Sequence, residues 1–194
     1  MYARRVGLVS FWLLFLSTAA LPAQKPGNSR PLLVCYGDSI TAGYGLAAGQ
    51  SYPDALQRDL DRSGFHFRVL NQGTSGATTK DAVAGVHAIL ALHPLIVVVE
   101  FGGNDGLRGL PLEQTRRNLD ALLTELQNAH IRILLAGITL PPNYGGEYIQ
   151  QFEQIYRDQA ARHHTAIVPM LYRRTDRCPR HDSARWHSPH RQRF

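Results

Sequence analysis

A serine that could act as a nucleophile follows the first apolar segment of the chain. Ser39 lies in the run Gly37-Asp38-Ser39-Ile40, directly after the apolar residues 32–36. The C-terminal end of a buried strand is the place where open α/β sheets bind their ligands. A small hydroxyl at such an edge is suited to covalent acyl transfer. The position of Ser39 therefore predicts serine-based nucleophilic chemistry.

Two further segments could stabilise the negative charge that develops during acyl transfer. Gly76 lies in the polar run 71–79, and Asn104 lies in the run 102–106, each directly after another strand-like segment. Hydrogen-bond donors must point at a developing oxyanion. The backbone N–H groups of Ser39 and Gly76 and the carboxamide of Asn104 are donors of the required kind. Glycine at position 76 would also let a substrate approach the backbone closely.

Other polar residues of these runs have alternative interpretations. Asp38 and Asp105 are expected to brace the turns rather than to act as acids, because aspartate commonly bonds nearby backbone groups. Ser75 is a rival nucleophile, but no Gly-x-Ser-x-Gly sequence surrounds it. The histidines that lie within or beside the expected helices and strands are interpreted as structural; they are His66, His87, His93, His130, His163 and His164.

The elements that must position these residues alternate along the chain. Strands are predicted over residues 32–36, 67–71, 95–101, 131–136 and 165–168, and helices over 52–62, 80–92, 112–129 and 147–163. Short apolar strands without polar alternation are typical of sheets that are covered on both faces. The βαβα order predicts one α/β domain, a three-layer α/β/α sandwich with a five-stranded parallel sheet. All three polar runs would then lie at one edge of the sheet.

These runs resemble the three blocks of the SGNH, or GDSL-type, hydrolases. Gly37-Asp38-Ser39-Ile40 resembles the first block with Ile in place of the usual Leu, Gly76 matches the second block, and Gly102-Gly103-Asn104-Asp105 matches the third. Segments 39–45, 100–109 and 137–145 are especially similar to the bacterial thioesterase, arylesterase and lysophospholipase branch. The resemblance covers roughly residues 30–172. Each block is a weak signal alone, but three in order are a strong one.

The resemblance implies a flavodoxin-like topology and the hydrolysis of a carboxylic ester or thioester through an acyl-Ser39 intermediate. It implies an oxyanion hole formed by Ser39, Gly76 and Asn104, and it implies no cofactor and no metal. The substrate would be a small ester or thioester with an acyl or aryl group. Tyr44 and the loop 141–148 are expected to shape the pocket for that group. A catalytically inactive binding or relic protein of the same fold is the alternative.

The family's last block, Asp-x-x-His, does not occur after residue 172. The nearest pair is Asp182 and His187, and the family's final helix is expected to be missing as well. One codon choice for residues 185–194, read one base later, encodes Asp-Gly-Ile-His-Pro-Thr-Ala-Asn-Gly, which is that block in full. This match predicts a frameshift between about residues 172 and 185 and little turnover, since loss of a triad member removes most of the rate. A zinc cluster is the rival interpretation of the tail; its ligands would be Cys178, His181, His187 and His190.

The two ends of the chain differ from its body. Residues 1–23 have the positive start, apolar stretch and small residues of a secretory signal, with an uncleaved anchor as the alternative. The domain is expected over residues 30–172, followed by an aberrant basic tail over 173–194. That tail carries +5 of the net charge of +6, so nucleic-acid binding is not indicated. We expect a periplasmic or secreted monomer with no membrane span after signal cleavage. Cys35 is expected to be a buried thiol, without a disulfide framework.

Overall fold

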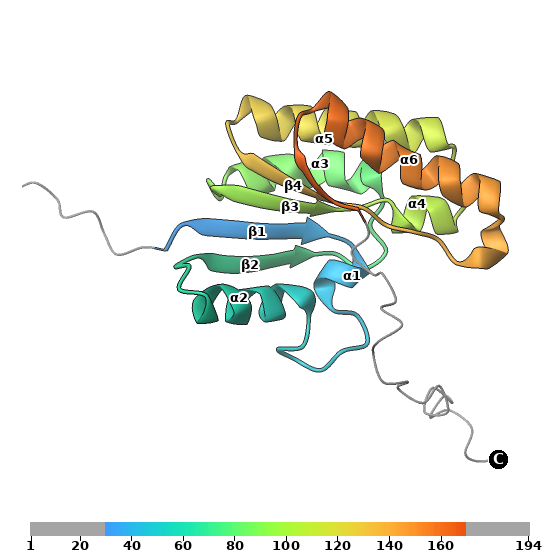
Figure 1. The fold of residues 1–194 in the computed structure, drawn as a ribbon. Helices are drawn as coiled ribbons and strands as arrows, with labels where there is room; N and C mark the ends of the chain where they lie inside the picture. Colours follow the sequence, from blue (N-terminus) through green and yellow to red (C-terminus); the bar gives the residue numbers. More distant parts are fainter. Residues whose placement is uncertain (1–29, 170–194) are drawn as a thin grey trace, which may run out of the picture.

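Five parallel strands form the sheet, in the order β2-β1-β3-β4-β5. The structure is a computed structural model that describes residues 30–169. Its strands are β1 (Leu32–Gly37), β2 (Arg68–Gly73), β3 (Ile96–Glu100), β4 (Arg132–Ala136) and β5 (Ala166–Val168). This order is that of the flavodoxin-like folds, so the predicted α/β sandwich is confirmed. All carboxyl ends lie at one edge of the sheet (Figure 1).

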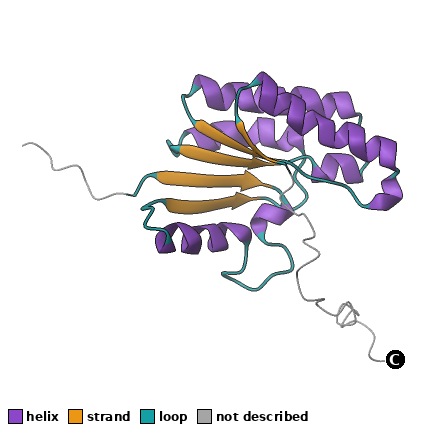
Figure 2. Ribbon diagram, viewed as in Figure 1, coloured by secondary structure: helices purple, strands orange, loops and turns teal. Residues whose placement is uncertain are grey.

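Helices cover both faces of the sheet. The short α1 (Ser39–Ala42) and α2 (Tyr52–Arg62) cover one face of the sheet, next to β1 and β2. The opposite face is covered by α3 (Thr79–Leu90), α5 (Leu112–Asn128) and α6 (Gly146–Arg162) (Figures 1 and 2). The predicted N-cap of α2 is confirmed: Ser51 accepts the N–H of Asp54, and the Asp54 carboxylate accepts the N–H of Ser51. Such reciprocal capping satisfies two donors that a helix start leaves open.

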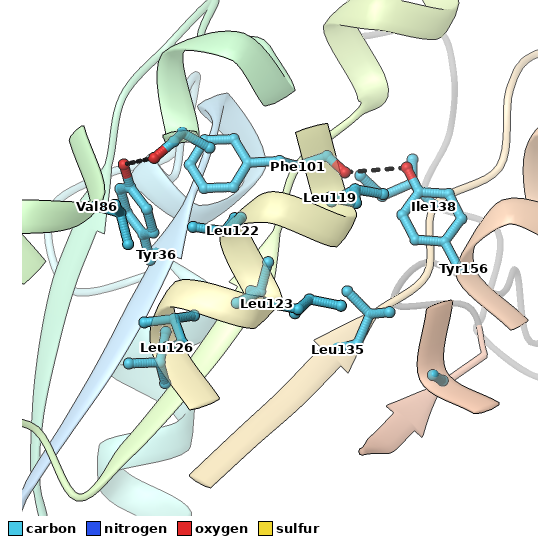
Figure 3. Packing of buried hydrophobic residues seen from close by; sticks show 14 of the residues in the cluster. Tyr36, Val86, Phe101, Leu119, Leu122, Leu123, Leu126, Leu135, Ile138 and Tyr156 are labelled. Atoms are coloured by element: carbon cyan, nitrogen blue, oxygen red, sulfur yellow. Dashed lines mark hydrogen bonds between the residues drawn. The ribbon is translucent and has the colours of Figure 1, made fainter. Parts of the chain in front are cut away.

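The larger core lies between the sheet and α3, α5 and α6. Four leucines of α5 recur at helical spacing and are fully buried against it (Figure 3); they are Leu119, Leu122, Leu123 and Leu126. Burying each such side chain contributes roughly 1.5–3 kcal/mol. A smaller core on the α2 side contains Leu33, Val98 and the predicted buried thiol of Cys35. The two cores therefore cover both faces of the sheet beneath its carboxyl edge.

Element boundaries differ from the predicted ones mainly at this edge. The helix 52–62 is confirmed at both ends, and the boundaries of the other long elements shift by at most two residues. Three segments expected to be turns or loops are helical: α1, α4 (Gly103–Leu107) and the 3₁₀ turn η1 (Pro142–Tyr144). In α1 the Asp38 carboxylate accepts the N–H of Ile40, and this cap allows one helical turn to form directly after β1.

Several expectations concern residues outside the described range. The signal segment 1–23, the basic tail 173–194, the pair Asp182 and His187, the missing final helix and the rival zinc ligands all lie there. Within residues 30–169, the structure contains no helix with the length and apolarity needed to cross a membrane.

Candidate active site

Ser39 begins α1 at the carboxyl end of β1. Its side chain is partly exposed, so the hydroxyl is within reach of solvent. The N–H groups on either side of it are occupied: that of Asp38 bonds the Glu100 carbonyl at 3.2 Å, and that of Ile40 bonds Asp38 Oδ1 at 2.9 Å. The N–H of Ser39 has no acceptor within residues 30–169. Ser39 thus presents both a hydroxyl and an unoccupied donor.

Ser39 and Asn104 flank the point at which the strand order reverses. The chain passes from β1 to β2 on one side and later returns to β3 on the other side. Ser39 follows β1, and Asn104 follows β3 on the short helix α4. A crevice opens outside the carboxyl ends at such a switch point, and ligands of open α/β sheets bind there.

Asn104 connects all three predicted blocks. Its Nδ2 donates to the Ala77 carbonyl at 2.9 Å and to Asp38 Oδ2 at 3.2 Å. Asp38 adjoins Ser39, and Ala77 adjoins Gly76, so the loops after β1, β2 and β3 are tied together at this side chain. A carboxamide nitrogen carries two hydrogens, and both are engaged by these acceptors. An oxyanion would therefore compete with the longer bond, the one to Asp38.

Gly76 lies exposed in the loop between β2 and α3. Its φ of +83° belongs to the left-handed region that favours glycine. The Gly76 carbonyl accepts a 2.9 Å hydrogen bond from Arg108 Nη2, while its N–H has no acceptor among the described residues. Arg108 thus holds the carbonyl of Gly76, while the N–H of Gly76, on the preceding peptide, is left unoccupied.

A tyrosine and an aspartate fix the loop that carries Asn104. The Tyr156 hydroxyl donates to the Phe101 carbonyl at 3.0 Å, where β3 has just ended (Figure 3). Gly102 has a φ of +122°, and a Cβ there would collide with the Tyr156 hydroxyl. Asp105 is buried and accepts the backbone N–H and the hydroxyl of Thr79. Asp105 therefore braces α4 against α3, in line with the interpretation from the sequence.

Two buried carboxyl groups adjoin the turn that carries Ser39. Asp38 is 2 % exposed, and Glu100 at the end of β3 is fully buried. Burial raises the pKa of Glu100 to about 8, and repulsion by Asp38 adds to this. Burial also raises the pKa of Asp38. The sequence interpretation gave Glu100 no role of its own, although a glutamate closing an otherwise apolar strand was a usable signal.

The described histidines lie at the opposite edge of the sheet. His66 precedes β2, and the other five lie near the ends of α3, α5 and α6, which run back to the amino ends of the strands; they are His87, His93, His130, His163 and His164. Their predicted structural role fits this placement. His163, for example, bonds Asp120 and Gln127 of α5. Within residues 30–169 no histidine therefore adjoins Ser39, and no cluster of possible metal ligands is found there.

The rival nucleophile Ser75 lies exposed in the same loop as Gly76. It is attached neither to a strand end nor to the start of a helix, because the loop continues to Thr78, the N-cap of α3. Among the described residues its hydroxyl has no hydrogen-bond partner. Nothing in this geometry orients Ser75 as a nucleophile.

Comparison with known proteins places this arrangement among hydrolases. The GDSL-like lipase/acylhydrolase family matches the chain over residues 35–190. Esterase TesA of Pseudomonas aeruginosa is 42% identical over 140 residues, which cover 72% of this chain and 70% of the relative. The thioesterase 1/protease 1/lysophospholipase L1 of Escherichia coli K12 is 37% identical over 140 residues, 72% of this chain and 66% of the relative.

A solved structure supports the same relationship. The esterase AlinE4, described as a member of the SGNH-hydrolase family, is 38% identical and superposes with a TM-score of 0.72. The match covers 80% of this chain and 86% of that structure. The fold and the sequence therefore point to the same set of relatives.

Proposed function

The chain belongs to the GDSL-like lipase/acylhydrolase family, and on that premise we propose that Ser39 is the nucleophile of a carboxylic ester and thioester hydrolase. The observation that supports this role is the tie between the three loops at Asn104, which brings the loops of Ser39 and Gly76 to one edge. Nucleophile and oxyanion donors must share such a site in acyl transfer.

The reaction proceeds in two steps. Ser39 Oγ attacks the carbonyl carbon, and the resulting oxyanion accepts the N–H groups of Ser39 and Gly76. Asn104 donates the hydrogen that points to Asp38 in the free protein. Collapse expels the alcohol or thiol and leaves an acyl-Ser39 ester, which water then hydrolyses. Serine needs a base to take its proton, and Asp182 with His187 are the candidates in the chain beyond residue 169.

The substrate is a small ester or thioester with an acyl or aryl group. Tyr44 is 80% exposed after α1, and the Tyr144 hydroxyl bonds the Leu107 carbonyl at 2.9 Å, which joins η1 to the end of α4. These two segments border the switch point and would contact the group attached to the carbonyl. We further propose that the protein is a monomer and that it acts after export, in the periplasm or outside the cell.

The test compares two serine variants of the full chain. Ser39→Ala should abolish hydrolysis of p-nitrophenyl acetate above the uncatalysed rate, and Ser75→Ala should retain the wild-type rate. Incubation with diethyl p-nitrophenyl phosphate should add one diethylphosphoryl group to Ser39, located by peptide mass spectrometry. Equal rates for wild type and Ser39→Ala would rule out the proposed nucleophile, and labelling at Ser75 would transfer the role to that residue.

An inactive binding protein remains the second candidate. It is favoured by the placement of the described histidines, all of which lie away from Ser39. We expect turnover to be reduced in that case to the contribution of the oxyanion donors, which alone can retain about 10³-fold over water. Binding of a p-nitrophenyl ester without any difference in turnover between wild type and Ser39→Ala would support this candidate.

A further inference from the structure

The side chain of Glu100 reaches from β3 to the first turn of α1. Its Oε2 accepts the Thr41 hydroxyl at 2.7 Å, the Thr41 N–H at 3.2 Å and the Asp38 N–H at 3.4 Å. The Thr41 hydroxyl also contacts the Tyr52 hydroxyl of α2 at 3.1 Å. One carboxyl oxygen therefore connects β3 to both residues that flank Ser39 and Ile40.

This contact has a selective effect on the backbone donors around the nucleophile. The first N–H groups of a helix have no acceptor within the helix. Glu100 accepts those of Asp38 and Thr41, and the Asp38 carboxylate accepts that of Ile40. Within the described residues, only the N–H of Ser39 in the run 38–41 is left without an acceptor. The carboxyls of Asp38 and Glu100 thus leave free the Ser39 N–H, which is the donor that a substrate oxyanion needs.

We propose that Glu100 is a positioning residue for Ser39, which fixes the 38–41 turn so that the Ser39 hydroxyl and N–H face the substrate. The inference rests on the proposed function, because it assigns Glu100 a purpose in orienting that nucleophile. Glu100 touches neither substrate nor reacting atoms in this role. It acts through Asp38 and Thr41.

The protonation state of Glu100 is consistent with such a role. Its Oε1 is buried and has no partner within residues 30–169, and a buried ionised carboxylate with a bare oxygen is costly. Asp38, in contrast, bonds Ile40 and Asn104. Burial, with Asp38 second, raises the pKa of Glu100 to about 8, so the neutral form prevails at pH 7. A neutral carboxyl still accepts three donors through one oxygen and leaves the negative charge to Asp38.

Three substitutions in the full chain separate positioning from general support of the fold. Glu100→Gln keeps a neutral side chain of the same shape with one carbonyl oxygen. Glu100→Leu keeps the bulk but removes the acceptor. Gln159→Leu is the matched control, because Gln159 is also a buried polar side chain, yet it bonds the Arg116 carbonyl on α5, away from the carboxyl edge.

The kcat of each variant should depend on whether residue 100 keeps a hydrogen-bond acceptor. We expect Glu100→Gln to hydrolyse p-nitrophenyl acetate with a kcat within about threefold of wild type, the factor of a single weak hydrogen bond. Glu100→Leu should lower kcat about 10- to 100-fold with little change in KM, since a small misplacement of a reacting group costs that much. A loss in Gln159→Leu equal to that in Glu100→Leu, or full activity of Glu100→Leu, would overturn the proposal.

Amide hydrogen exchange gives a readout that does not depend on turnover. The N–H of Thr41 should exchange faster in Glu100→Leu but stay protected in Glu100→Gln and Gln159→Leu, whereas the N–H of Asp38 keeps the Glu100 carbonyl as an acceptor in every variant. Unchanged exchange in Glu100→Leu would contradict the positioning role. If wild type and Ser39→Ala hydrolyse the ester equally, the proposed function fails, and the exchange pattern still decides whether Glu100 holds this turn.

A milder variant applies if Glu100→Leu does not fold. Thr41→Val removes the 2.7 Å bond to Glu100 and the 3.1 Å contact with the Tyr52 hydroxyl, and it preserves the shape of the side chain. It should lower kcat about three- to tenfold, the size of one hydrogen bond, and it should leave the fold intact. Wild-type kcat in a folded Thr41→Val variant would show that the Thr41 hydroxyl is not part of the positioning contact and would overturn the proposal in this form.

Discussion

Asp38 and Asn104, 66 residues apart in the chain, are joined by a 3.2 Å hydrogen bond from Nδ2 to Oδ2. The bond links the cap of the helix that begins with Ser39 to the side chain proposed as an oxyanion donor. It also means that Asn104 must exchange one acceptor for another when an oxyanion forms. Its second bond, to the Ala77 carbonyl at 2.9 Å, keeps the carboxamide in place during that exchange.

Removing the Asn104 carboxamide should therefore reduce the chemical step. We expect Asn104→Ala to lower kcat for p-nitrophenyl acetate by about 10²–10³-fold, as is usual for the loss of one oxyanion donor. Asn128→Ala, at the exposed end of α5, is the control and should behave as wild type. If Asn104→Ala keeps its kcat but raises KM, the side chain binds substrate in the ground state and is not an oxyanion donor.

Gly37 is expected to be intolerant of any side chain. A Cβ at this position would collide with the Thr41 hydroxyl and would lie 2.6 Å from Glu100 Oε2. Overpacking of this kind costs typically about 1–3 kcal/mol in the free energy of unfolding. Urea denaturation of Gly37→Ala should show a lower midpoint with an unchanged slope. Gly146→Ala, where a Cβ meets nothing within 4 Å at the start of α6, should be neutral or slightly stabilising; equal midpoints for both variants would refute the predicted clash.

The long elements and the sheet were predictable because their signals are local. The leucines of α5 repeat at helical spacing, and Ser51 with Asp54 forms the expected capping box. The helices α1 and α4 were not predictable, because their sequences are common in turns and their helical form depends on distant partners. The Thr41 N–H, for instance, bonds Glu100, 59 residues away. The occupied hydrogens of Asn104 depend in the same way on contacts between loops.

Arg108 is predicted to support the backbone orientation at Gly76. Its Nη2 donates 2.9 Å to the Gly76 carbonyl from an exposed position, so its loss should leave stability within about 0.5 kcal/mol of wild type. We expect Arg108→Ala to lower kcat about three- to tenfold, because the N–H of Gly76, one peptide before the held carbonyl, is then less well oriented. Arg117→Ala is the control, since Arg117 forms only an exposed ion pair on α5. Equal activity of the two variants would mean that Arg108 does not orient this donor.

The gene itself tests the predicted frameshift. If the codons of residues 185–194 read Asp-Gly-Ile-His-Pro-Thr-Ala-Asn-Gly in the next frame, a chain carrying that peptide in register should contain the Asp-x-x-His block. We expect such a chain to hydrolyse p-nitrophenyl acetate at least 10³-fold faster than the chain with Asp182 and His187, since the oxyanion donors alone supply only a small part of triad catalysis. Codons that encode a different peptide would reject the frameshift.

The raised pKa of Glu100 predicts that stability falls as the pH rises. Its pKa is about 8 in the folded chain against an ordinary value of 4.5, mainly because the carboxyl is buried and secondly because Asp38 repels its negative charge. Tyr52 and Tyr156 are other titratable groups nearby, and the charge of Asp105 raises the pKa of Asp38. Below pH 4.5 the carboxyl is protonated in both the folded and unfolded states and costs nothing. Between about 4.5 and 8 only the unfolded state releases the proton, so the free energy of unfolding decreases; above 8 the full cost is reached.

Glu100→Gln isolates this contribution because the amide does not titrate in that range. Urea denaturation of wild type and Glu100→Gln at a series of pH values from 5 to 9 should show the variant gaining stability relative to wild type as the pH rises. The raised pKa of Asp38 has the same sign, but it is present in both proteins and largely cancels in the difference. A difference that stays constant across this range would mean that Glu100 is ionised in the folded chain near its ordinary pKa. In that case, the hydrogen bonds that Glu100 accepts from Thr41 and Asp38, with those that Asp38 accepts from Ile40 and Asn104, would have to balance the repulsion between two buried charges.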